Sequence, residues 1–176
     1  MRYRVGDVYR CVISENSAEE SKVPRFKYID RTPDIIDIAG FTRITESAID
    51  NVIQLSGLAI EDWVAVKEFT QQNKPKMHLY VEMKKEALST NAMSREILRD
   101  HLSIYFKYLD QDYDDLKKIL GMDPLDITIL KCGTFNDYRK SGIGYMRKVN
   151  PDSQQVRNLV GIQEDVWVNG GGECSD

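Results

Sequence analysis

The order of strand-like and helix-like segments predicts an α+β fold, a small mixed or antiparallel β-sheet with packed helices. Short segments rich in Val, Ile and Tyr alternate with longer segments whose apolar residues recur at helical spacing. The chain has 176 residues, of which 41% are apolar and 30% charged. This length and composition are typical of a globular domain that buries a real core.

The N-terminal part is predicted to be mainly strand. Residues 1–14 and 25–30 carry strand-forming side chains on either side of the polar segment 15–24, so a hairpin is the simplest arrangement. Residues 35–38 (Ile-Ile-Asp-Ile) form a further short strand that ends at residues 39–40 (Ala-Gly).

A helix is predicted to begin after Thr45, because threonine is a good N-cap. Ile44 and Ile49 flank this cap as a hydrophobic staple, and Gly57 supplies the C-terminal stop.

Strands and helices also alternate in the rest of the chain. Strands are predicted from Trp63 and from Lys76, followed by a long helix, a shorter helix, a strand at 125–130 and a brief helix near 133–140. The long helix has one predicted apolar stripe, formed by Ile97, Leu98, Leu102, Tyr105, Phe106 and Leu109. A glycine cluster and weak periodicity predict a partly ordered tail over residues 161–176.

Composition excludes several classes of protein. A net charge of -4 argues against a general nucleic-acid binder. Cys11, Cys132 and Cys174 are widely spaced and odd in number, which indicates reduced thiols. No apolar run is long enough to span a bilayer and no signal peptide is recognisable, so we expect a cytoplasmic protein with no membrane partner.

The common catalytic sets are not recognisable. His78 falls inside a predicted strand and His101 on the apolar stripe of a helix, where a histidine is usually a packed residue. No Cys/His spacing suits zinc, and we expect no metal site formed by this chain. No Walker A, GxSxG or GxGxxG motif occurs.

The segment Tyr3-Arg4-Val5-Gly6-Asp7 resembles the Y-R-x-G-D motif of the adenylate-forming superfamily. In that superfamily the aspartate accepts hydrogen bonds from both ribose hydroxyls of ATP, which suits the two oxygens of an ionised carboxylate. The resemblance implies that Asp7 contacts ATP. The structural alternative is a β-turn with Gly-Asp at its corner.

A second segment, residues 30–46, looks like the superfamily stretch that holds a ribose-contacting arginine, a hinge, and the first strand and helix of a lid domain. Arg31 takes the arginine position, and residues 32–34 take the hinge. Asp30 and Asp37 stand where the superfamily has glycine and lysine. The alternative is a strand-turn-helix unit with solvated charges.

Arg43 matches the position of a cation that approaches the α-phosphate in the superfamily. One residue is inserted between Gly40 and Arg43, and arginine replaces the lysine usual in plant enzymes. Because arginine can hold phosphate oxygens in bidentate fashion, the exchange is tolerable. The alternative is a solvated residue at the start of a helix.

The third segment, Leu125 to Phe135 followed by Tyr138, resembles the L-P-x-G-T-F-x-x-Y stretch of acyl-acid amido synthetases of the auxin-responsive-promoter family. The segment 109–113 and the helix after it look like bacterial members. These enzymes use ATP to join a carboxylic acid to an amino acid. The resemblance runs from about residue 3 to about residue 150.

The family has a lysine after the G-T-F motif that enters the active site for adenylation. Arg139, Lys140, Arg147 and Lys148 compete for this position, and Lys148 fits the spacing best. The resemblance therefore implies that Lys148 is the catalytic cation. The alternative is an ordinary solvated basic cluster.

The resemblance implies a domain organisation. Residues 1–31 are the end of the region that contacts an N-terminal domain, 32–34 the hinge, 35–160 the C-terminal lid domain, and 161–176 the tail. The large N-terminal adenylation domain is the expected partner and is absent from this chain, which we expect to be inactive alone. ATP and Mg²⁺ are the expected cofactors of the full-length enzyme, with a carboxylic acid and an amino acid as substrates.

Two other functions stay open. The chain could be the lid of an acyl-CoA ligase, although the Gly133-Thr134-Phe135 stretch argues against it. It could also be a free-standing, non-catalytic α+β binding module that kept the fold of the lid.

Overall fold

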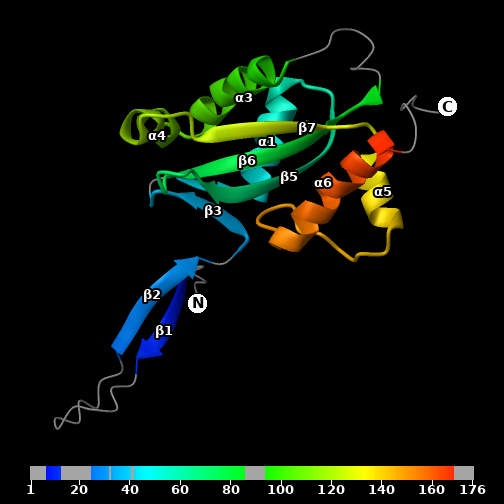
Figure 1. The fold of residues 1–176 in the computed structure, drawn as a ribbon. Coiled ribbons are helices and arrows are strands. Elements are labelled where there is room, and N and C mark those ends of the chain that lie inside the picture. Colours follow the sequence, from blue (N-terminus) through cyan, green and yellow to red (C-terminus); the bar gives the residue numbers. More distant parts are fainter. Residues whose placement is uncertain (1–6, 13–24, 32, 41, 86–93, 169–176) are drawn as a thin grey trace. The chain divides into compact units, whose positions relative to one another are not determined.

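The computed structural model describes residues 7–12, 25–31, 33–40, 42–85 and 94–168 (Figure 1). In chain order the elements are β1 (Asp7–Val12), β2 (Arg25–Arg31), β3 (Ile35–Ile38), β4 (Thr42–Thr45), α1 (Glu46–Ser56), β5 (Ile60–Phe69), β6 (Pro75–Met83), α3 (Arg95–Leu109), α4 (Asp112–Leu120), β7 (Leu125–Leu130), α5 (Thr134–Lys140) and α6 (Ser153–Val168). The predicted α+β fold is confirmed. The chain divides into two compact units, Met1–Pro33 and Asp34–Asp176.

The first unit contains the antiparallel pair of β1 and β2. Both strands lie where the sequence predicts them, and the register is irregular between Val8 and Tyr9. Residues 3–6 of the Tyr3–Asp7 motif lie outside the described residues. Asp7 begins β1 directly opposite Arg31, the last residue of β2.

The second unit is built on a three-stranded mixed sheet with the order β5-β6-β7. β5 and β6 are antiparallel, and β6 and β7 are parallel. β5 begins at Ile60, three residues before the predicted start at Trp63. β3 and β4 form a separate antiparallel pair, and their connection passes through Ala39 and Gly40, both with positive φ.

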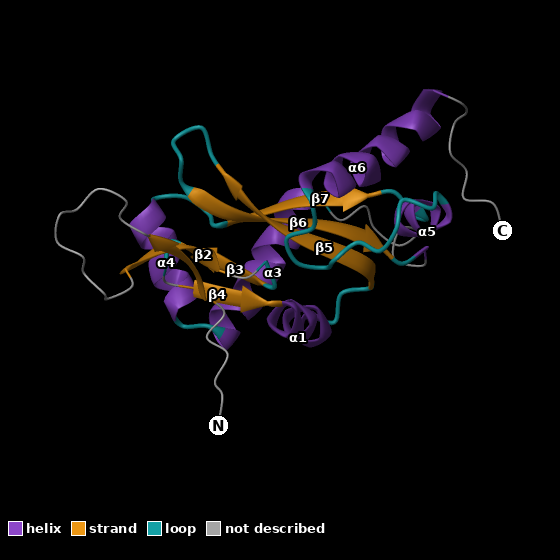
Figure 2. Ribbon diagram, turned by 90° about the horizontal axis from the view of Figure 1, so that it is seen from below, coloured by secondary structure: helices purple, strands orange, loops and turns teal. Residues whose placement is uncertain are grey.

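The two faces of the three-stranded sheet pack against different helices because side chains alternate along each strand. One face meets α1, α3, α4 and the β3–β4 pair in the larger core; its sheet residues include Ala65, Met77, Leu79, Val81 and Ile127. The other face packs against α5 and α6 in a smaller core formed by Val64, Tyr80, Leu130, Phe135, Tyr138 and Leu159. Figures 1 and 2 show these helices around the sheet.

α1 begins and ends as the sequence predicts. The Thr45 hydroxyl accepts a hydrogen bond from the Ala48 amide at 3.2 Å. Gly57 ends the helix in the left-handed conformation, with φ of 65°. Ile44 and Ile49 are both buried in the larger core.

The packed face of α3 is narrower than the predicted apolar stripe. Ile97 and Leu109, placed in that stripe, are 59% and 42% exposed. Residues four apart on a helix share one face, and this face is centred on the buried residues Leu98, Leu102 and Phe106. His101 is half-buried, and its Nε2 lies 3.2 Å from the Ser56 carbonyl oxygen.

The C-terminal region is more helical than its weak periodicity indicates. α6 continues past Gly161 to Val168, whereas the sequence predicts a partly ordered tail from residue 161. Residues 169–176 lie outside the described part of the chain. No helix in the described residues is both long and apolar enough to cross a membrane.

The Gly-Thr-Phe motif lies at the start of α5 and donates backbone hydrogen bonds to a buried carboxylate. Glu82, 4% exposed at the end of β6, accepts hydrogen bonds from the amides of Gly133 at 2.6 Å and Phe135 at 2.9 Å. Gly133 has φ of 88°, a conformation that favours glycine. The Thr134 hydroxyl donates to the Lys131 carbonyl oxygen at 2.8 Å. The motif therefore fixes where Phe135 enters the smaller core.

The other end of this sheet face carries a hydrogen-bonded polar cluster. The two ring nitrogens of His78 lie 3.0 Å from Glu68 Oε2 and 2.8 Å from Thr128 Oγ1. The ammonium of Lys76 donates to Asp126 Oδ2 at 2.9 Å, and Arg95 forms an ion pair with the same carboxylate. His78 is thus a packed strand residue, as predicted.

We expect Glu82→Gln to destabilise the fold. Glutamine has one acceptor oxygen where glutamate has two, so its NH2 group would face one of the two backbone N–H donors and one hydrogen bond would be lost. The free energy of unfolding should therefore fall by about 1–3 kcal/mol. Urea denaturation of the chain measures this loss. Glu61→Gln, at an exposed position of β5, is the control and should have little effect. Equal stability of both variants would contradict the role of the Glu82 carboxylate.

Asp126 should contribute to the acid sensitivity of the fold. Burial raises the pKa of Asp126, but hydrogen bonds from Lys76 and Arg95 outweigh it and hold the pKa well below its usual range. Because the folded-state pKa is depressed, the stabilisation is present above the unfolded pKa of about 4 and is lost as pH falls further. Between about pH 5 and pH 2, the free energy of unfolding should therefore fall more steeply in the wild type than in Asp126→Asn. Asp100→Asn, on the exposed side of α3, should keep the wild-type slope; a wild-type slope in Asp126→Asn would refute the assignment.

Candidate functional site

The segment that carries Lys148 is hydrogen-bonded to the edge of β5 that β6 does not occupy. The Ala65 amide donates to the Lys148 carbonyl oxygen at 2.8 Å, and the Asn150 amide donates to the Ala65 carbonyl oxygen at 2.8 Å. Val149 forms a parallel β-bridge with Ala65 and is buried. The backbone on both sides of Val149, directly after Lys148, is therefore fixed to the sheet.

Asn150 strengthens this attachment with its side chain. Its Oδ1 accepts a hydrogen bond from the Lys67 amide at 2.9 Å, and its Nδ2 donates to the Ile35 carbonyl oxygen at 3.2 Å. Asn150 has φ of 44°, a left-handed conformation in which asparagine is several-fold enriched. The chain turns here toward α6 while staying bonded to β5 and β3.

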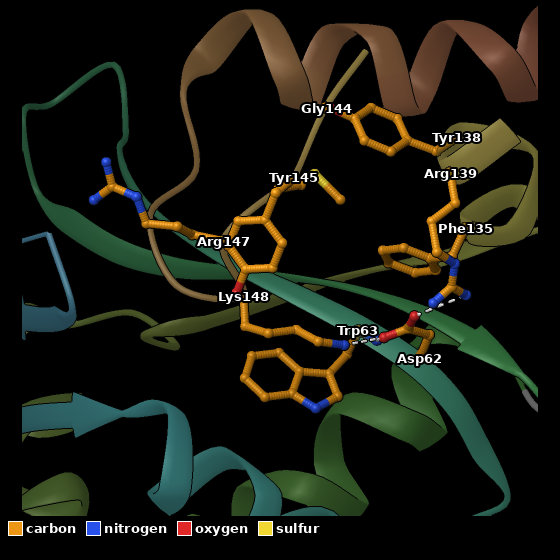
Figure 3. A pocket seen from close by; sticks show the side chains of 10 residues that line it. Asp62, Trp63, Phe135, Tyr138, Arg139, Gly144, Tyr145, Arg147 and Lys148 are labelled. Carbon is orange, nitrogen blue, oxygen red and sulfur yellow. Dashed lines mark hydrogen bonds and ion pairs between the residues drawn. The ribbon is translucent and has the colours of Figure 1, made fainter. Parts of the chain in front are cut away.

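The Lys148 side chain lies between a carboxylate and two aromatic rings. Its ammonium forms an ion pair with Asp62 and lies 5.3 Å from the ring centroid of Trp63 and 5.8 Å from that of Phe135. Both distances are within the range of cation–π attraction. Figure 3 shows Lys148 reaching past Trp63 toward Asp62. The Lys148 side chain is 34% exposed, so solvent still reaches it.

The two rings come from separately fixed elements. The indole Nε1 of Trp63 donates to Asp50 Oδ1 of α1 at 3.0 Å, which ties β5 to α1. Phe135 is positioned by the buried carboxylate of Glu82. Lys148 therefore occupies a site assembled from β5, α5 and the segment before α6.

The segment that carries Lys148 lines both a cavity and a groove. The cavity has a volume of about 160 Å³, and its walls are Asp62, Trp63, Phe135, Tyr138, Arg139 and residues 144–148. The groove is more open, about 750 Å³, and is lined by residues of β3, α1 and their neighbours together with Tyr145, Arg147, Lys148 and Val149. Tyr145, Arg147 and Lys148 face both.

The cations that compete with Lys148 in the sequence have different surroundings. Lys140 is exposed at the end of α5. Arg147 is exposed and lines both the cavity and the groove. Arg139 is 66% exposed, and its Nη2 lies 3.4 Å from Asp62 Oδ2. Of these four, Lys148 is the cation that contacts both aromatic rings.

The other predicted nucleotide-contacting residues lie elsewhere. Asp7 and Arg31 are cross-strand neighbours in the first unit. Arg43 lies in β4 opposite Asp37 and is exposed; it lines neither the cavity nor the groove. Arg43 thus lies within the strand that leads into α1.

Asp62 and Trp63 were not predicted as site residues. Asp62 lies 86 residues before Lys148 in the chain, and no spacing rule connects two residues so far apart. Trp63 was predicted only as a strand residue. Their partnership with Lys148 follows from the pairing of the 148–150 segment with β5.

Metal binding has no evident place in the described part of the chain. Within residues 7–12, 25–31, 33–40, 42–85 and 94–168, no three His, Cys, Asp or Glu side chains converge to hold a metal ion. An Mg²⁺ ion needs oxygen ligands in octahedral geometry and often takes several of them from nucleotide phosphates and water.

The fold is similar to that of solved structures of acyl acid amido synthetases. A GH3.15 acyl acid amido synthetase has a TM-score of 0.54 and 16% identity, covering 93% of this chain and 30% of that chain. AtGH3.15 acyl acid amido synthetase in complex with 2,4-DB has a TM-score of 0.50 and 17% identity, covering 91% of this chain and 30% of that chain. At these identities the likeness establishes a shared fold. The chain spans about 30% of the length of these synthetases.

The sequence itself gives the family. No curated protein is detectably similar to the chain. The GH3 family C-terminal domain, however, matches residues 44–151, a range that runs from the end of β4 through the Lys148 segment and covers more than half of the chain. The resemblance found in the sequence motifs is confirmed: the chain belongs to the GH3 family and carries its C-terminal domain.

Proposed function

We propose that this chain is the lid of an ATP-dependent synthetase that adenylates a carboxylic acid and then joins it to an amino acid. The observation that carries the proposal is the Lys148 site: a long cationic side chain on a segment fixed to the sheet edge. The GH3 family membership and the fold shared with acyl acid amido synthetases support the same function.

The first half-reaction forms an acyl-adenylate and pyrophosphate from ATP and the acid. The carboxylate of the acid attacks the α-phosphate, and pyrophosphate leaves with the bonding electron pair. Negative charge therefore gathers on the phosphate oxygens in the transition state. Lys148 is the residue proposed to meet this charge, because a preorganised cation stabilises the transition state more than the ground state.

Asp7 and Arg31 are proposed to contact the ribose of ATP. They are cross-strand neighbours at the end of the β1–β2 pair, so one nucleoside could engage both. A carboxylate accepts hydrogen bonds from a cis-diol, and a guanidinium donates to ribose oxygens. Arg43 is proposed as a second cation for the α-phosphate. ATP supplies the activated phosphoryl centre, and its phosphates would carry the Mg²⁺ ion.

The second half-reaction requires the lid to change position. Residues 32–34 are proposed to be the hinge, and the division between the two compact units falls after Pro33. Rotation there would withdraw Lys148 and admit the amine that attacks the acyl carbonyl, with AMP as the leaving group.

A cytoplasmic location is part of the proposal. It is supported by the proposed use of ATP and by Cys11 and Cys132, which form no disulfide.

ATP–pyrophosphate exchange over a panel of carboxylic acids tests the proposed function. The 176-residue chain and the full-length product of its gene are compared, and exchange is expected in the longer protein with at least one acid. The acyl-adenylate is then trapped with amino acids or with CoA. Conjugation to an amino acid supports the proposal; transfer to CoA, or no exchange by a folded full-length product, would overturn it.

Lys148→Ala should slow adenylation by about 100- to 1000-fold, because one preorganised donor on the developing charge is removed. Amide formation from a supplied acyl-adenylate should fall far less. Single-turnover measurement of each half-reaction provides the test. Lys140→Ala and Arg147→Ala are the matched comparisons; a larger adenylation loss in either of them would reassign the catalytic cation.

Asp7→Ala should raise the KM for ATP by about 10- to 100-fold, as expected for losing hydrogen bonds to a charged acceptor. The KM for the carboxylic acid should change little. 2′-Deoxy-ATP provides a check, since the wild type should lose affinity for it while Asp7→Ala should discriminate less. Unchanged discrimination between the two nucleotides would leave Asp7 as a strand residue only.

A further inference from the structure

Asp62 is shared by two cations that come from different parts of the chain. Its Oδ1 accepts a hydrogen bond from the Trp63 amide at 2.8 Å and forms the ion pair with Lys148. Its Oδ2 lies 3.4 Å from Nη2 of Arg139, which extends from α5 (Figure 3). The Asp62 side chain is only 11% exposed. The carboxylate therefore depends on these two cations, since little water reaches it.

Asp62 competes with any phosphate that Lys148 would bind. A carboxylate and a phosphate are both anions, so an ammonium that moves toward the phosphate must give up the carboxylate. The departure leaves Asp62 largely buried without its nearer cation, and an unpaired buried charge is strongly unfavourable. Release of Lys148 is therefore easier where another cation takes its place.

Arg139 has the position and the chemistry for this exchange. Its guanidinium is 66% exposed and already lies near the second oxygen of Asp62. A guanidinium presents several N–H donors in one plane and can bind both oxygens of a carboxylate at once. Lys148 at 34% exposed has a four-carbon side chain that can swing away while its backbone stays on β5.

We propose that Asp62 is the resting partner of Lys148 and that Arg139 takes over the Asp62 carboxylate when Lys148 leaves for a phosphate. The proposal rests on the proposed function in one respect, namely that Lys148 acts on ATP. Asp62 and Arg139 are then positioning residues that set how readily Lys148 becomes available. Neither needs to touch the substrate.

The exchange predicts opposite effects for the two partners. In the full-length product of the gene, Asp62→Asn should raise the rate of ATP–pyrophosphate exchange at subsaturating ATP by about three- to tenfold, because the neutral amide competes less. Asparagine still accepts the Trp63 amide hydrogen bond, so the fold is preserved. Arg139→Gln should lower the same rate by a similar factor. Lys84, which is exposed and directly follows β6, provides the control: Lys84→Gln should leave the rate unchanged.

The double variant Asp62→Asn/Arg139→Gln distinguishes two roles of Arg139. Arg139 either replaces Lys148 beside the Asp62 carboxylate or acts directly on the substrate. When Asp62 is already neutral, no buried carboxylate needs a second cation, so Arg139→Gln should have no further effect in the Asp62→Asn background. An equal loss in both backgrounds would overturn the proposal, because Arg139 would then act on the substrate itself. Effects of the same sign for Asp62→Asn and Arg139→Gln would overturn it too.

A chemical readout on the 176-residue chain tests the ion pair independently of catalysis. Lysine acetylation with acetic anhydride, followed by mass spectrometry, compares Lys148 with the exposed Lys84 in each variant. Lys148 should be protected in the wild type and labelled several-fold faster in Asp62→Asn. Equal labelling of Lys148 in the wild type and in Asp62→Asn would refute the resting ion pair, regardless of the result of the adenylation assays. Protection of Lys148 together with unimpaired adenylation by Lys148→Ala would instead remove the proposed action of Lys148 on ATP, and with it the exchange of partners, while leaving the resting ion pair in place.

Discussion

The two backbone hydrogen bonds between Ala65 and the 148–150 segment are the contact on which the site depends. They form an isolated parallel β-bridge at the edge of β5, where Val149 is buried. Without them, the segment between α5 and α6 would lose the backbone bridge that holds Lys148 beside β5, the strand that carries Trp63. The Asn150 side chain adds two further hydrogen bonds to this contact, one to β5 and one to β3. A loop fixed in this way can carry a residue whose position matters to chemistry.

A second constraint on the site comes from the sheet face that packs against α5 and α6. The buried Glu82 carboxylate holds the first amides of α5, and Phe135 and Arg139 follow within two turns. The Gly-Thr-Phe motif therefore connects α5 to β6 through hydrogen bonds to Glu82. Its effect on Lys148 is indirect, through the ring of Phe135 and the guanidinium beside Asp62. A motif shared by a family can thus be structural and still determine the geometry of a site.

Local signals in the sequence predicted much of the fold. Thr45 and Gly57 marked the ends of α1 because caps are encoded within one turn. The strands β5, β6 and β7 followed from their side-chain patterns. The predicted apolar stripe of α3 was too wide at Ile97 and Leu109, since helical periodicity does not tell how wide a face of the helix its neighbours cover. α6 was missed because its periodicity is weak.

The site was predictable only in part. The family motifs pointed to Lys148, but its partners Asp62 and Trp63 were not recognised. They meet Lys148 through sheet pairing across 86 residues, and no periodic pattern records such a contact. Glu82 was missed for the same reason, because its partners lie on a different element, 51 and 53 residues away.

The three neighbours of the Lys148 ammonium differ in what they would do to an incoming anion. The faces of Trp63 and Phe135 attract a cation by about 0.5–2 kcal/mol without carrying a charge, so they can stay in place when a phosphate approaches. The Asp62 carboxylate attracts the same cation but repels the phosphate. In the proposed action of Lys148 on a phosphate, the contact with Asp62 is the one of the three that has to be exchanged, and a second cation lies beside it. The site thus combines a backbone that stays fixed with a side chain that can be released, and lysine suits this arrangement because its compact charge sits on a long flexible stem.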